Sequence, residues 1–159
     1  MRRRGILLGL VPFLVLLHFF LHLGLSLGRE APDLLTLALL LAARETRMGT
    51  AAALGFFFGI LEDAFSVLAF GASALALTLV GAMGSLTREL FVGDSPLFVL
   101  AYLGLGKLLK DLVFWVTAGP AVTESFVEGV LIHGSLGGLY LTLVGFLLLK
   151  FLGGTRELL

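Results

Sequence analysis

The grouping of charged residues is the feature of this chain that most limits what it can fold into. Charged side chains occur in short groups, and the stretches between these groups are almost entirely apolar. The first such stretch, residues 5–28, contains no charged residue at all. A helix that crosses the hydrocarbon core of a membrane needs about 20 apolar residues. The pattern therefore predicts a series of transmembrane helices separated by short polar turns.

The composition of the chain agrees with this expectation. Only 14% of the residues are charged, whereas a soluble domain carries about 25%. So few polar side chains cannot cover the surface of a globular protein in water. A protein that is surrounded by lipid does not need a polar surface. The 159 residues allow at most about six or seven spans and no separate soluble domain. The formal net charge of zero and the lack of cysteine give no indication of a nucleic-acid partner or a disulfide framework.

We predict an all-α integral membrane protein, a bundle of six transmembrane helices that forms one domain over residues 1–159. The second and third spans are short, and the sequence leaves open whether each of them fully crosses the membrane. The six predicted spans are 5–28, 32–43, 48–62, 66–86, 97–118 and 126–151.

Residues 34–61 allow two arrangements. They form either two short spans joined by a cytoplasmic turn at residues 44–47, or a re-entrant hairpin that enters from outside. The hairpin would place Arg44 and Arg47 near the middle of the membrane, at a cost of about 2.5–3.5 kcal/mol each. Two short spans instead let both arginines reach the cytoplasmic headgroups. We therefore favour the two-span arrangement.

The distribution of basic residues supports six spans. With the amino terminus in the cytoplasm, eight Lys and Arg residues fall in cytoplasmic segments and only Arg29 falls in an outer one, while Lys107 and Lys110 lie within a span. This bias agrees with the positive-inside rule. A five-span arrangement would move Lys150 and Arg156 to the outside and weaken the bias. We therefore expect both termini in the cytoplasm.

Small residues recur at four-residue steps in the third predicted span. Ala51, Gly55 and Gly59 lie on one helix face that leads to Asp63. Such a face lets a neighbouring helix approach closely, so it could bind a partner helix or pack helices within the bundle. Asp63 is expected to cap the turn that follows it. The same pattern recurs at Gly81 with Ser85 and at Gly134 with Gly138.

Three charged residues interrupt the fifth predicted span. Lys107 and Asp111 are four residues apart on the helix, so they can pair. Charges within a membrane usually face the bundle interior or a cavity. Together with Lys110, the pair could form a polar pocket or bind an acidic group of a partner. It could also be a self-neutralising structural pair, or the lysines could extend to the headgroups.

The histidines do not predict a metal or catalytic centre. His18 and His22 have the four-residue spacing of metal ligands, but no third ligand can be identified, and a histidine face within the bundle is the better interpretation. An intramembrane serine protease would need Ser73 with His133 as its base, yet the residues around Ser73 do not fit that role. We expect a protein that is not an enzyme, with no catalytic residues, no metal and no cofactor.

Residues 32–86 contain a distinctive series of motifs: Pro32-Asp33-Leu34-Leu35, the turn 44–47, Gly55, Gly59, Asp63, Ser66, Gly71, Leu75-Ala76 and Val80-Gly81. In these motifs, residues 32–86 resemble the rod-shape-determining protein MreD family. The resemblance implies a non-enzymatic subunit of the bacterial cell-elongation machinery (the elongasome) in the cytoplasmic (inner) membrane. Such a subunit binds the single-span protein MreC and, through it, influences the glycosyltransferase and transpeptidase of peptidoglycan synthesis, and thereby cell shape. Where other members have a basic end to the fourth helix, this chain has only Arg88 beside Glu89.

The family is also similar in helix arrangement to the substrate-binding subunits of energy-coupling-factor transporters. This similarity implies an alternative function, a membrane subunit that binds a small molecule or a lipid, with Glu62, Asp63 and Ser66 facing a pocket. Membrane lipids are expected partners in either case. The residues predicted to form the partner interface or the pocket are Gly55, Gly59, Asp63, Ser66, Gly71 and Gly81.

Overall fold

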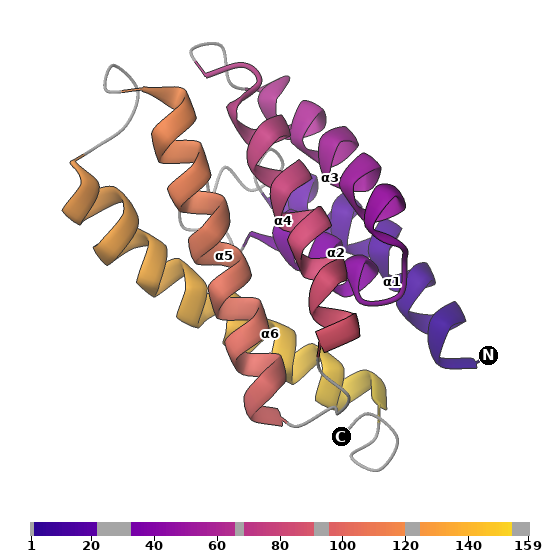
Figure 1. Cartoon of the computed structure of the whole chain (residues 1–159). Coiled ribbons are helices and arrows are strands. Elements are labelled where there is room, and N and C mark those ends of the chain that lie inside the picture. The colour runs from indigo at the N-terminus through magenta and orange to yellow at the C-terminus, as the bar shows by residue number, and fades with distance from the viewer. Residues whose placement is uncertain (1, 22–32, 66–68, 91–95, 120–124, 154–159) are drawn as a thin grey trace.

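The computed structural model describes residues 2–21, 33–65, 69–90, 96–119 and 125–153 (Figure 1). These residues are all-helical and contain no strand. The helices are α1 (Arg2–Phe19), α2 (Leu34–Ala43), α3 (Met48–Asp63), α4 (Ala72–Leu90), α5 (Pro96–Ala118), the π-helical segment η3 (Val127–Gly134) and α6 (Ser135–Gly153).

The helices lie in the stretches predicted from the sequence, so the all-helical architecture is confirmed. The main difference is the fourth helix, which begins at Ala72 and not at residue 66. It begins late because Gly71 has a φ of +96°, a turn conformation that precedes the helix. The part of the first predicted span from residue 22 onward lies outside the described residues.

One helix among the described residues, Val127–Lys150, is long and apolar enough to cross a membrane on its own. Shorter apolar helical stretches occur at Gly9–Phe19, Leu34–Ala43 and Ala72–Thr87. Six crossings therefore stay a prediction, and the confirmed part of it is the helical bundle.

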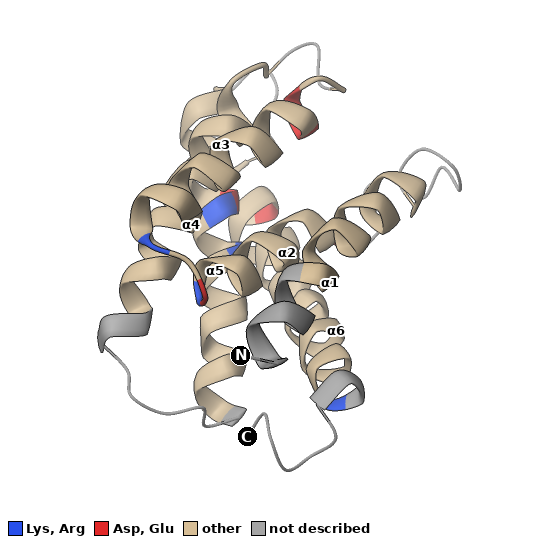
Figure 2. Ribbon diagram, turned by 90° about the vertical axis from the view of Figure 1, so that its right-hand side faces the viewer, with Lys and Arg blue, Asp and Glu red and all other residues tan. Residues whose placement is uncertain are grey.

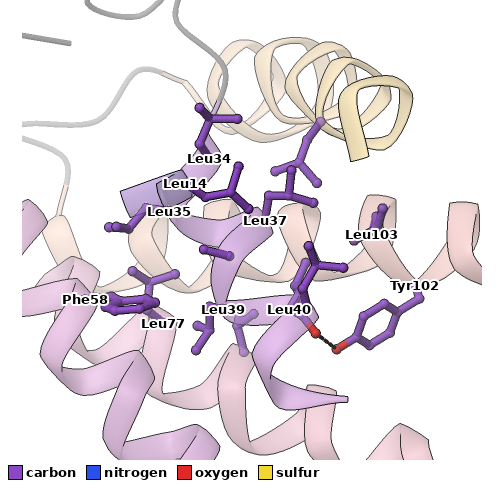
Figure 3. Packing of buried hydrophobic residues seen from close by; sticks show 14 of the residues in the cluster. Leu14, Leu34, Leu35, Leu37, Leu39, Leu40, Phe58, Leu77, Tyr102 and Leu103 are labelled. Carbon is purple, nitrogen blue, oxygen red and sulfur yellow. Dashed lines mark hydrogen bonds between the residues drawn. The ribbon is translucent and has the colours of Figure 1, made fainter. Parts of the chain in front are cut away.

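Helix α2 forms the centre of the bundle. All ten of its residues are buried, and it packs against α1, α3, α4, α5 and α6. Its leucines contact side chains such as Leu14, Leu77 and Leu103 from the surrounding helices (Figure 3). The Tyr102 hydroxyl of α5 donates a 2.8 Å hydrogen bond to the Leu40 carbonyl (Figure 3). A helix that is apolar on all sides is stable only when it is surrounded in this way.

The outer surface of the bundle is apolar as well. Large hydrophobic side chains are exposed on every helix except α2. Leu139 of α6 is 70% exposed and Phe57 of α3 is 58% exposed. Charged residues are few, and they lie in small groups along the ribbon (Figure 2).

Candidate functional site

Asp63, the last residue of α3, caps the amino end of α4. Its side chain is buried, and its carboxylate accepts the backbone N–H groups of Gly71 (2.9 Å), Ser73 (3.1 Å) and Ala74 (2.9 Å). A carboxylate at the amino end of a helix satisfies donors that have no partner within the helix. The expectation that Asp63 caps the turn after α3 is confirmed.

The predicted glycine interface is occupied by the chain itself. A side chain on Gly55 would overlap the Leu77 carbonyl of α4, and one on Gly59 would overlap the Ala74 backbone. On the opposite side, a side chain on Gly81 would overlap the Ala51 carbonyl of α3. The surface that we expected to be open to a partner is thus covered by α4, because the absence of side chains lets the two backbones meet. Of the two alternatives, packing within the bundle is the arrangement found.

Two further residues of the predicted interface have other surroundings. Gly71 lies in the turn before α4, and open space surrounds the position where a side chain would begin. Its contribution is its positive φ and the N–H that it donates to Asp63. Ser66 lies outside the described residues.

Lys110 of α5 joins the ends of two other helices. Its ammonium group lies 2.7 Å from Asp33 Oδ2, at the amino end of α2, and 2.8 Å from Glu62 Oε1, near the carboxyl end of α3. The Lys110 side chain is only 7% exposed. Buried charges are tolerated when they are paired and hydrogen-bonded. Lys110 therefore ties α2 and α3 to α5.

Lys107 and Asp111 extend this group of charges. They form the expected pair along α5, and Lys107 Nζ also lies 3.6 Å from Asp33 Oδ2. Asp33 has a second role, because its carboxylate accepts the Thr36 N–H at 3.1 Å and the Thr36 hydroxyl at 2.8 Å. We call Asp33, Glu62, Lys107, Lys110 and Asp111 the charge cluster.

Part of the charge cluster was not predicted. The sequence indicated the Lys107–Asp111 pair, but it did not connect Lys110 with Asp33 or Glu62. These partners are 77 and 48 residues away along the chain. The available signal was general: a charge in an apolar span needs an opposite charge, and both carboxylates lie at helix ends. Because Lys110 is held by the chain's own carboxylates, a partner's acidic group could bind there only by displacing them.

One oxygen of the charge cluster is not satisfied. Asp111 Oδ2 is buried and has no hydrogen-bond partner among the described residues. It lies against η3, where a side chain on Gly134 would begin 3.2 Å from it. An unsatisfied buried oxygen needs an explanation in a native structure.

Comparisons with protein-family models, with curated proteins and with solved structures found no match.

The turn between α2 and α3 forms a second polar group, towards the opposite end of the bundle. The Arg44 guanidinium lies over the rings of Phe98 and Tyr102 in α5, 5.7 and 5.8 Å from their centroids. The Thr46 carbonyl accepts a 2.9 Å hydrogen bond from the Ser85 hydroxyl of α4. The turn is thus fixed to the carboxyl end of α4 and the amino end of α5. Arg47, at the start of α3, is exposed.

Ser73 and His133, the residues considered for proteolysis, lie on helices that do not pack against each other. His18 is buried with its ring edge-on to Phe19, while His22 lies outside the described residues. The part of the chain that the structure describes holds no group of three His, Asp or Glu side chains suited to a metal ion. Ser73 is buried in α4, and His133 is exposed on η3, which packs against α5 and α6.

Proposed function

We propose that this protein is a membrane-embedded bundle whose six helical segments cross the bilayer. The observation that carries the proposal is the exposed apolar surface. Soluble monomers rarely expose apolar patches larger than a few hundred Å², yet leucine and phenylalanine side chains lie exposed on five of the six α-helices and on η3. Lipid chains are the solvent that such a surface fits.

The two ends of the bundle support an orientation. The end with the turn 44–47 carries the exposed Arg47, and Arg44 is held there by aromatic rings. Towards the other end lie the carboxyl end of α3, with Glu62 and Asp63, and the amino end of η3, with Glu128. Lys107 and Lys110 also lie near Glu62, but they are largely buried among the carboxylates of the charge cluster and are not at the surface. Basic residues prefer the cytoplasmic side of a membrane. We therefore place the turn 44–47 in the cytoplasm and the Asp63 end outside.

We further propose a non-enzymatic scaffold role in the cell-elongation machinery, with MreC as the partner. The support is the resemblance of residues 32–86 to the MreD family, together with the structural use of the resembling residues. Gly55, Gly59, Asp63 and Gly71 build the α3–α4 hairpin, and Asp33 anchors α2 through Lys110. These contacts give a rigid frame, and a partner helix would then bind on the exposed surface of that frame.

Co-purification with MreC tests this role. The full chain, tagged and extracted in mild detergent, is co-expressed with MreC from the same organism, and the control is MreC without its transmembrane helix. We expect full-length MreC to co-elute and the truncated form to be lost. If MreC does not co-elute, or if the truncated form co-elutes equally well, the proposed helix scaffold is wrong.

Ligand binding is the alternative that a specific observation favours. Asp111 Oδ2 is buried without a partner among the described residues, and the nearby Glu62 side chain is 27% exposed. Native mass spectrometry of the purified protein distinguishes this function. A stoichiometric small molecule that is retained by the unmodified chain and lost from Asp111→Asn would favour it. A chain that carries only exchangeable detergent or lipid would contradict it.

A further inference from the structure

Helix α3 presents a short apolar face to the surroundings. It has 16 residues, so its length is about 24 Å, against about 30 Å for the hydrocarbon core of a typical bilayer. Met48, Phe56 and Phe57 are exposed along it. Arg47 stands at one end, and Glu62 lies near the other. The distance between these polar ends cannot increase without breaking the helix.

The neighbouring helix gives this face no extra height. The apolar part of α4, Ala72–Thr87, also has 16 residues (72 to 87 inclusive). Gly55 and Gly59 bring the two backbones into contact, so α3 and α4 cannot slide past each other without a clash. The Asp63 carboxylate ties the end of α3 to the start of α4. The α3–α4 hairpin therefore has an apolar outer surface that is short along the helix axes and cannot lengthen. We call this surface, on α3 and residues 72–87 of α4, the α3–α4 wall.

The opposite case is the helical stretch Val127–Lys150. It has 24 residues, of which the first eight are the π-helical η3. Because a π-helix rises less per residue, the stretch is shorter than the ~36 Å of a regular α-helix, but it still reaches across the hydrocarbon core. In Figure 1, α6 runs obliquely across α5. A helix that is too long can tilt, whereas one that is too short makes the surrounding lipid adapt. Of these two surfaces, the α3–α4 wall is therefore the one that requires a change in the bilayer.

We propose that the α3–α4 wall thins the bilayer around it and preferentially binds phospholipids with short acyl chains. The inference rests on the membrane location proposed above. The occupant is a phospholipid, because acyl chains match the exposed Met48, Phe56 and Phe57 of α3, and a phosphate headgroup matches the exposed Arg47 at one end of the helix. The α6 side, with Leu139 at 70% exposure, is expected to accept longer chains.

Tryptophan quenching by brominated lipids tests the inference. The chain has one tryptophan, so Trp115→Phe provides a silent background for two matched variants, Phe57→Trp on α3 and Leu139→Trp on α6. Both sites are exposed, so the substitutions should leave the packing intact. The full chains are reconstituted in phosphatidylcholine with myristoleoyl, oleoyl or erucoyl chains, and quenching by the brominated forms gives relative lipid binding constants.

We expect the Phe57→Trp protein to bind the myristoleoyl lipid about twofold or more better than the erucoyl lipid, and the Leu139→Trp protein to lack this preference. The same chain-length dependence at both positions would overturn the short-wall inference while leaving the membrane location intact. Quenching at Leu139→Trp alone would mean that protein covers α3, which also overturns it. No quenching at either position would remove the membrane location itself. As a second measurement, the unmodified chain should have its highest unfolding temperature in the shorter lipids.

Discussion

Lys110 brings a full charge into the interior of the bundle, and two carboxylates from other helices meet it there. Its side chain is 7% exposed, and its ammonium contacts Asp33 and Glu62. Removing one member of a buried ion group is costly because the remaining charges stay buried without a partner. Replacing the whole group with neutral side chains of similar size is often tolerated.

Lys110→Met should therefore destabilise the protein by about 3 kcal/mol. Adding Asp33→Asn and Glu62→Gln to that variant should recover most of the loss, because no unpaired charge remains and Asn keeps the capping oxygen at α2. Thermal unfolding in detergent, followed by Trp115 fluorescence, measures both effects. If the triple variant were no more stable than Lys110→Met, the loss in Lys110→Met would not come from buried carboxylates left without a partner.

Asp63 has its effect through hydrogen bonds to the backbone. Asp63→Ala leaves the N–H groups of Gly71, Ser73 and Ala74 without their acceptor, so we expect a loss of about 2 kcal/mol in unfolding free energy. Asp63→Asn should lose less than Asp63→Ala, because it keeps one oxygen. The exposed Thr117→Val serves as the control in the same unfolding assay. Equal stability of Asp63→Ala and the control would contradict the capping role.

At the scale of single residues, contacts between residues that are close in the chain could be predicted from the sequence, whereas contacts between residues far apart in the chain could not. The role of Asp63 could be predicted because its acceptor geometry follows from the end of one helix and the start of the next. The partners of Lys110 could not, since no periodicity relates residues 77 and 48 positions apart. Pairing over such separations depends on the packing of the whole bundle.

The α3–α4 hairpin depends on close contact between helix backbones. At Gly59 even a methyl group would overlap the Ala74 backbone, whereas nothing lies within 4 Å of the equivalent position at Gly49, on the same helix. Gly59→Ala should therefore destabilise the protein by about 2 kcal/mol. Gly49→Ala should be neutral or slightly stabilising, because alanine favours helix more than glycine does.

Both glycine variants are measured by thermal unfolding in the same detergent. If Gly59→Ala were as stable as Gly49→Ala, the two helices would not meet as closely as described. The pair is a matched control, since the substitution and the helix are the same and only the neighbouring atoms differ.

Hydropathy predicted where each helix lies better than it predicted the residues at which each helix begins and ends. Charged groups separate the apolar stretches, and each stretch contains a helix. The start of α4 was misplaced, because a turn that includes apolar Phe65 and Phe70 cannot be distinguished from helix by hydropathy. The π-helical segment Val127–Gly134 could not be predicted either, since its residues have no distinct pattern. The small residues at four-residue steps did predict a close helix contact, but the pattern does not say whether the partner lies in the same chain.

For the whole molecule, the proposed membrane location depends on the exposed apolar surface. The proposed orientation depends on the exposed Arg47 at one end of the bundle and on the acidic residues at the other. The leucine-rich centre around α2 would fit a soluble protein as well. The exposed phenylalanines and leucines are what favours a membrane. The short wall, the anchored turn 44–47 and the charge cluster acquire their proposed roles only in that setting.

Accessibility of single cysteines in intact cells tests the membrane arrangement most directly. The native chain has no cysteine, so Arg47→Cys and Phe65→Cys, both at exposed positions, report the two ends of α3 without background. With a thiol reagent that does not cross membranes, we predict that Phe65→Cys is labelled in intact cells and that Arg47→Cys is labelled only after the cells are opened. Labelling of Arg47→Cys from outside, or labelling of both positions from the same side, would contradict the crossing of α3 and the bundle orientation that depends on it.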